Sequence, residues 1–199
     1  MTAAPAVTAW TRSPSITVVA EGEDPRVALV GEAVAFWNQT LVGLGSNFRL
    51  GNITAIDQPV PETDLRQFGS WFVGPPQPIR PVAPESLLVV PGDLIIYLGH
   101  SAFVSFASGF VPQGRRIIGI RGGASAPMNQ PNVARNVITH EIGHAIGLGH
   151  NADPRLLMCG RPAPCRPGDF LSNEPRVLPI SLEEKQQLLG MYPPDWRPR

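Results

Sequence analysis

Residues 139–150, THEIGHAIGLGH, constrain the fold of this 199-residue chain most, because they hold three of its four histidines. On an α-helix, residues four apart lie one turn above each other, so His140 and His144 can offer two imidazole nitrogens to one ion. Gly147 can adopt the positive φ that ends a helix, which lets the chain turn back and bring His150 to the same point. The spacing therefore predicts a helix, a glycine turn and a site for one metal ion.

Three neutral imidazoles and one open position are typical of catalytic zinc, whereas structural zinc is normally closed by four protein ligands. Glu141 points about 100° away from His140 on a helix, near enough to act on a water at the metal without being a ligand. The alternative is that the histidines are ordinary polar residues on a helix face. A glycine and a histidine at the positions of Gly147 and His150 would both occur by chance in about one of 500 comparable chains, which favours the metal site. We therefore predict Zn²⁺ on His140, His144 and His150, with Glu141 as the catalytic residue.

The pattern H-E-x-x-H-x-x-G-x-x-H is the metzincin signature, and the chain resembles the metzincin zinc metallopeptidases. Within them, "HEIGHAIGLGHNADPRLLM" and "PISLEEKQQLLGMYP" are most similar to the active-site stretch and C-terminal helix of the matrixins, the matrix metalloproteinase-like family. The resemblance implies that Met158 forms the Met-turn beneath the metal. A thioether is a poor zinc ligand beside three histidines, so Met158 is expected to be a packing floor for the rings.

Three positions near the signature depart from the matrixin pattern. Asn151 follows His150 where matrixins usually carry a small hydroxyl residue, and Met158 is followed by Cys159 and Gly160 instead of Tyr and Pro. No tyrosine lies two positions beyond Met158, so the tyrosine ligand of astacins has no counterpart.

The accessory sites of matrixins are not expected either. The one remaining histidine is His100, and residues 99–123 contain no acidic side chain, so we predict neither a structural zinc nor a calcium site. The cysteine-switch motif is also missing, so latency through a propeptide thiol is not expected.

The two cysteines allow two interpretations. Cys159 and Cys165 could close a small disulfide across "CGRPAPC", or a Cys159 thiolate could reach and block the metal. We favour the disulfide, which would indicate an oxidising, secreted or otherwise extracytoplasmic setting. The first fifteen residues contain no pattern typical of a signal peptide.

Composition indicates a compact globular protein, with 43% hydrophobic and 16% charged residues. Sixteen basic and sixteen acidic residues balance, so no attraction to nucleic acid or anionic membrane is expected, and no apolar run is long enough to cross a bilayer. We predict a monomer with one catalytic domain, residues 1–199, divided into an upper part of about 1–147 and a small C-terminal subdomain of about 148–199.

Periodicity predicts an α+β fold. β-Branched segments indicate strands at residues 15–20, 47–54, 94–98 and 115–120, and the proline-rich segment 57–86 is expected to be a surface loop. Helices are expected after Asp24 as N-cap with Pro25 first, after Asn132 as N-cap, and from Ser181, which forms a capping box with Glu184 and precedes a stop at Gly190. The metzincin, zincin-like resemblance implies a twisted mixed sheet with an antiparallel edge strand, an active-site helix, a Met-turn and a C-terminal helix.

The expected function is that of a zinc endopeptidase acting on extended polypeptides. The segment containing Ile117, Ile118, Gly119 and Ile120 is the candidate edge strand for substrate, with an ordinary core strand as its alternative. The resemblance implies that residues 161–178 form the wall of the pocket after the scissile bond, because the chain passes there between the Met-turn and the last helix in the family fold. One alternative function is a catalytically idle metal- or peptide-binding module, but the intact Glu141 argues against it. The other alternative is a zinc hydrolase that acts on a non-peptide amide.

Overall fold

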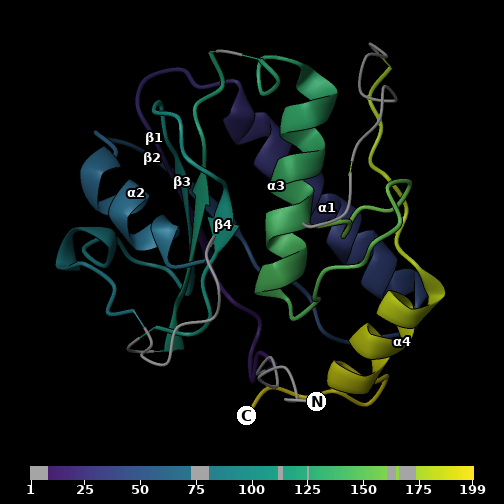
Figure 1. The fold of residues 1–199 in the computed structure, drawn as a ribbon. Coiled ribbons are helices and arrows are strands. Elements are labelled where there is room, and N and C mark those ends of the chain that lie inside the picture. The colour runs from purple at the N-terminus through teal and green to yellow at the C-terminus, as the bar shows by residue number, and fades with distance from the viewer. Residues whose placement is uncertain (1–8, 73–80, 112–113, 125, 161–164, 166–173) are drawn as a thin grey trace.

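A twisted five-stranded sheet forms the centre of the computed structural model, which describes residues 9–72, 81–111, 114–124, 126–160, 165 and 174–199 (Figure 1). The strand order is β2-β1-β3-β5-β4, in which all pairs are parallel except the last. The strands are β1 (Ile16–Ala20), β2 (Ile53–Asp57), β3 (Leu94–Leu98), β4 (Phe106–Ala107) and β5 (Arg116–Ile120). The expected mixed sheet with an antiparallel edge strand is confirmed.

Helices cover both faces of the sheet (Figure 1). On one face α1 (Arg26–Gly43) and α3 (Pro131–Ala145) pack side by side over one hydrophobic core. On the other face α2 (Glu62–Ser70) and the 3₁₀ turn η1 (Glu85–Leu87) cover a second core. The side chains of β3 alternate between them, because Leu94, Ile96 and Leu98 belong to the first core and Ile95 and Tyr97 to the second.

The helix α2 corrects the prediction of a surface loop over residues 57–86. Glu62 and Asp64 stand in its first turn, where acidic side chains favour a helix N-terminus. Leu65 and Phe68, three residues apart, place one buried face on the sheet. The nine-residue helix is short and its neighbours are rich in proline, so its apolar period was too brief to be recognised.

The second strand was also misplaced. β2 begins at Ile53, whereas the pattern predicted a strand from residue 47. Phe48 and Leu50 are buried in the first core, and Gly51 donates its N–H to the carbonyl of Pro14 at 3.0 Å. A Cβ on Gly51 would lie 2.7 Å from that oxygen. The alternation before Ile53 therefore reflects core packing and a close backbone crossing.

The predicted helix starts agree only partly with those in the structure. The last helix, α4 (Leu182–Met191), has the predicted capping box between Ser181 and Glu184, although it continues through Gly190. The predicted N-cap of α1, Asp24, is wrong by one residue, because Pro25 holds that position and the helix begins at Arg26. The N–H of Arg26 nevertheless donates to the Asp24 carboxylate at 2.8 Å.

The predicted N-cap of α3, Asn132, is wrong, because Gln130 holds that position and Pro131 is the first helical residue. Asn132 is buried instead. Its amide donates to the carbonyl of Glu174 at 2.8 Å and accepts from the N–H of Arg176 at 3.1 Å. Asn132 therefore ties the segment before α4 to the start of α3.

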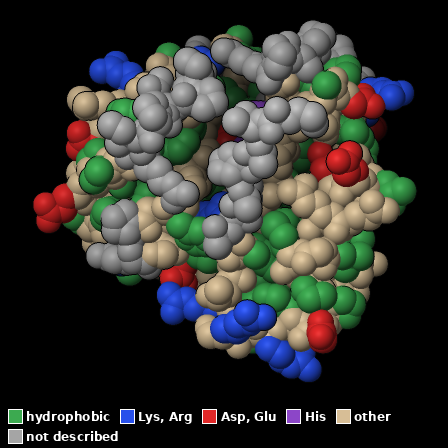
Figure 2. Space-filling model, turned by 60° about the horizontal axis from the view of Figure 1, so that its bottom comes forward, with side chains coloured by type: hydrophobic (Ala, Val, Ile, Leu, Met, Phe, Trp, Pro, Cys, Tyr) green, Lys and Arg blue, Asp and Glu red, His purple; other side chains and the backbone are tan. Residues whose placement is uncertain are grey.

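The surface carries mixed charge. Figure 2 shows acidic and basic side chains interspersed around one face of the molecule, in line with the equal numbers of the two signs. Among the helices that the structure describes, none combines the length and apolar character that a membrane span requires.

Replacing Leu65 by Ala tests the second core. Leu65 is fully buried between α2 and the sheet, so the substitution is expected to lower the free energy of unfolding by about 2–5 kcal/mol. The control Gln67→Ala, at an exposed position of the same helix, is expected to change it by less than about 0.5 kcal/mol. Urea denaturation measures both, and equal midpoints would contradict the packing of α2 on the sheet.

Candidate metal centre

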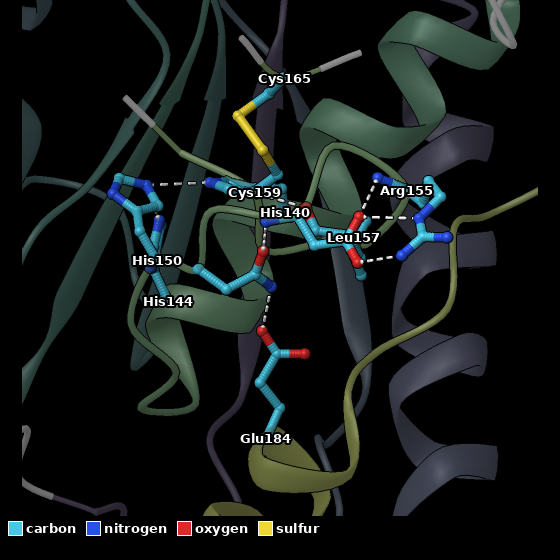
Figure 3. The surroundings of a disulfide bond; sticks show 10 residues. His140, His144, His150, Arg155, Leu157, Cys159, Cys165 and Glu184 are labelled. Atoms are coloured by element: carbon cyan, nitrogen blue, oxygen red, sulfur yellow. Dashed lines mark hydrogen bonds and ion pairs between the residues drawn. A yellow bond between two sulfur atoms is a disulfide. The ribbon is translucent and has the colours of Figure 1, made fainter. Parts of the chain in front are cut away.

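The three histidines of the signature converge. His140 and His144 lie on the last turns of α3, and His150 follows the turn after it (Figure 3). One ring nitrogen of each lies within 4.8 Å of the others. The Nε2 atom of His150 is 2.9 Å from Nε2 of His144 and 3.3 Å from Nε2 of His140.

Backbone carbonyls orient two of the rings. Nδ1 of His140 lies 2.8 Å from the carbonyl oxygen of Leu157, and Nδ1 of His144 lies 2.8 Å from that of Leu148. A carbonyl only accepts, so both Nδ1 atoms carry the proton and both Nε2 atoms present a lone pair to the centre of the cluster. Burial lowers the pKa of His144 to about 4, which favours the neutral ring. Neutral, convergent imidazole nitrogens are a donor set that fits zinc.

The turn after α3 brings His150 to this cluster. Gly147 has φ of 109°, and its N–H donates to the carbonyl of His144 at 3.0 Å. The N–H of Leu148 donates to the carbonyl of Gly143, also at 3.0 Å. These two bonds form a Schellman motif, which requires a left-handed residue at the position of Gly147.

Side chains from distant segments satisfy the carbonyls at the end of α3. Arg116 donates to His144 at 3.2 Å, Trp10 to Ala145 at 2.8 Å, the Tyr192 hydroxyl to Ile146 at 3.0 Å and Gln187 to Gly147 at 3.0 Å. Burial lowers the pKa of Arg116 only to about 10, so its charge persists at neutral pH and favours the helix C-terminus. Sequence reasoning gave none of these donors a role, since no local pattern relates them to α3.

Met158 packs against the backbone of α3. Its side chain is fully buried, and a Cβ on Gly143 would lie 2.6 Å from Sδ of Met158 and 2.9 Å from Cζ2 of Trp37. The indole N–H of Trp37 donates to the carbonyl of Thr139 at 2.9 Å. The glycine between the first two histidines therefore allows Met158 and Trp37 to approach the helix closely.

The chain beyond Met158 contacts the ring of the third histidine, His150. Cys159 and Cys165 form a disulfide, so Cys159 presents no thiolate in this structure (Figure 3). The neighbouring Gly160 lies directly on the His150 ring, where a Cβ would come 2.1 Å from Cγ of His150. The proposed pocket wall, residues 161–178, lies outside the described residues except for residue 165 and residues 174–178.

The candidate substrate strand is not at the edge of the sheet. Ile117, Ile118, Gly119 and Ile120 are buried in β5, which pairs with β3 on one side and with β4 on the other. The edge strand next to β5 is β4, where Phe106 pairs with Gly119, and β2 forms the opposite edge. β4 has only two residues, too few for an alternating pattern to reveal it, and the core-strand alternative for β5 is the one observed.

The other predicted residues lie as follows. Glu141 is buried on α3 beside His140, with 6% of its surface exposed. His100 is outside the three-histidine cluster, the one group of potential metal ligands found among the described residues. Its ring lies 3.5 Å from the carboxylate of Glu21 at the surface.

Gly160→Ala tests the packing of His150. The added methyl group would collide with the imidazole, so zinc affinity is expected to fall about 10–100-fold, as for lost ligand support in other metal sites. Gly149→Ala is the control, because a Cβ there meets no atom within 4 Å although it adjoins the same histidine. Competition with a chromophoric zinc chelator measures both, and equal affinities would contradict the placement of His150 against Gly160.

Comparison with known proteins agrees with this geometry. A family model described as a dual-action HEIGH metallo-peptidase matches residues 98–163, about a third of the chain, and the letters HEIGH stand here at residues 140–144. No curated protein matches the chain.

Two solved structures are similar. Archaemetzincin from Methanopyrus kandleri has 15% sequence identity and a TM-score of 0.54, with 91% of this chain and 96% of that chain covered. Myroilysin has 11% identity and a TM-score of 0.49, with 94% of this chain and 86% of that chain covered. The first likeness shows a metzincin-like fold. The matched HEIGH segment and the three-histidine cluster together indicate that the chain is a zinc metallopeptidase.

Proposed function

We propose that the chain is an endopeptidase that hydrolyses peptide bonds of extended polypeptides, with His140, His144 and His150 as zinc ligands. The convergence of their Nε2 atoms, two of them on rings oriented by carbonyls, is the observation that supports this most directly. When bound, zinc would lower the pKa of a water molecule and polarise the scissile carbonyl. Met158 serves as the packing floor, supported by its burial against Gly143.

Glu141 is the general base of this proposal. It directly follows His140 on α3, the helix that carries two of the proposed ligands, and it is buried there. Its carboxylate accepts a proton from the attacking water and delivers it to the leaving amine. A site that served only to hold zinc would not need such a residue.

The substrate strand is revised from β5 to β4. An extended peptide can add to the edge of a sheet through main-chain hydrogen bonds, with specificity left to side-chain pockets. β4 ends the strand order, which supports it as the site of addition.

Several broader features belong to the same proposal. The disulfide supports secretion or another oxidising setting. The capping box of α4 supports the finer resemblance to matrixins. We also propose that residues 1–199 form one monomeric catalytic domain, with the substrate cleft between residues of about 1–147 and 148–199.

Glu141→Gln is expected to retain zinc at wild-type stoichiometry and to lower peptide hydrolysis at least about 10²–10⁴-fold, because the amide cannot accept the proton. A quenched-peptide or casein assay, with and without chelator, measures turnover, and elemental analysis measures zinc. The matched control is Glu183→Gln, an exposed glutamate on α4, which is expected to keep full activity.

The results of these assays distinguish the proposed endopeptidase from the two alternative functions. Equal activity of Glu141→Gln and wild type would remove Glu141 from its role. A wild-type protein that binds zinc but cleaves no peptide would favour the idle binding module, and hydrolysis confined to non-peptide amides in a substrate screen would favour that class of zinc hydrolase.

A further inference from the structure

His150 is the one proposed ligand that lies outside α3, so its position depends on what holds the following chain. The N–H of Asn151 donates to the carbonyl of Met158 at 2.9 Å, and the carbonyl of Asn151 accepts from the N–H of Gly160 at 3.1 Å. The backbone beside His150 is therefore attached on both sides to the segment around Met158.

The side chain of Asn151 extends this attachment to the last helix. Its amide nitrogen donates to Oε1 of Glu184 at 2.6 Å, and its amide oxygen accepts from the N–H of Asp153 at 2.9 Å. These partners fix the orientation of the amide, because a carboxylate only accepts and an N–H only donates. In Figure 3, the Glu184 side chain extends from α4, and a dashed line marks its hydrogen bond to the Asn151 amide.

Glu184 uses its two oxygens for different tasks. Oε2 accepts from the N–H of Ser181 at 2.6 Å, and the N–H of Glu184 donates to the Ser181 hydroxyl at 3.1 Å, which completes the capping box. Capping α4 needs only Oε2, whereas Oε1 is directed at Asn151. Glu184 as a residue is 5% exposed, and a charge-assisted hydrogen bond shielded from water is stronger than a neutral one.

We propose that Glu184 is a positioning residue of the metal centre, which holds Asn151 and through it the third ligand, His150. The inference rests on the proposed role of His150 as a ligand. Glu184 lies 33 residues from Asn151 in sequence and acts through the amide, not on the metal or the substrate. The docking of α4 is thereby linked to the geometry of the metal site.

An exchange of the two polar groups tests this role. Asn151→Asp places two carboxylates opposite each other, so zinc affinity is expected to fall about 10–100-fold. Glu184→Gln is also expected to weaken binding, because it replaces one of the two accepting oxygens by an NH₂ group, which then faces another donor, the Asn151 amide or the Ser181 N–H. The double variant Asn151→Asp/Glu184→Gln restores the bond between residues 151 and 184 with donor and acceptor reversed, while the amide oxygen at 184 still accepts from the N–H of Ser181. Its affinity is expected within about threefold of wild type.

Two readouts separate positioning from general stability. Chelator competition measures zinc affinity, and the visible absorption of the Co²⁺-loaded protein reports the coordination geometry. Ser181→Ala is the matched control, because it removes the capping hydroxyl and leaves the Asn151–Glu184 bond intact. It is expected to lower the melting temperature while zinc affinity and the Co²⁺ spectrum stay unchanged.

The inference is overturned if Asn151→Asp binds zinc like wild type, if the double variant does not recover, or if Ser181→Ala weakens zinc as much as Glu184→Gln does. Should Asn151→Asp not fold, the comparison of Glu184→Gln with Ser181→Ala decides alone. The variant His150→Ala separates a failure of the proposed ligand set from a failure of the proposed role of Glu184. If it retains wild-type zinc affinity, the proposed ligand set fails, and if it loses affinity while Asn151→Asp does not, only the role of Glu184 fails.

Discussion

The end of α3 is the constraint on which the metal centre depends. A helix leaves its last carbonyls without intrahelical partners, and a buried carbonyl without a hydrogen bond costs about 1–3 kcal/mol. Here the helix ends at Ala145, one residue after His144, and the turn at Gly147 lets the chain return with His150. The N-terminal segment, β5 and α4 each supply donors to this end, through Trp10, Arg116, Gln187 and Tyr192. The fold thus stabilises a helix terminus that is buried among other elements.

The sheet and α1 hold the same helix from its buried side. The first core contains residues of α1, α3 and three parallel strands, and Trp37 of α1 both packs on Gly143 and donates to Thr139. The close approach at Gly143 leaves no space for a side chain there, so the Trp37 side chain of α1 packs directly on the backbone of α3. A rigid support of this kind keeps His140 and His144 in one orientation.

The C-terminal segment controls the remaining geometry. Leu157 orients the His140 ring, Gly160 lies on the His150 ring, and Asn151 connects the turn to Glu184 of α4. One helix thus places the first two proposed ligands, whereas the third depends on contacts made by the chain around it, including the bond from Asn151 to Glu184, 33 residues away. The metal centre is therefore complete only when the segment after α3 has folded against α4.

The sequence by itself determined the elements that depend on neighbouring residues. The spacing of His140, Glu141 and His144, the positive φ of Gly147, the strand Leu94–Leu98 and the capping box at Ser181 all follow from local backbone geometry. Only the tertiary structure decided which segments meet. It made β4 the edge of the sheet, placed α2 within the proline-rich segment, and brought Arg116 and Tyr192 to the end of α3. Such pairings join residues far apart in the chain, and neither periodicity nor a turn residue carries information about a distant partner.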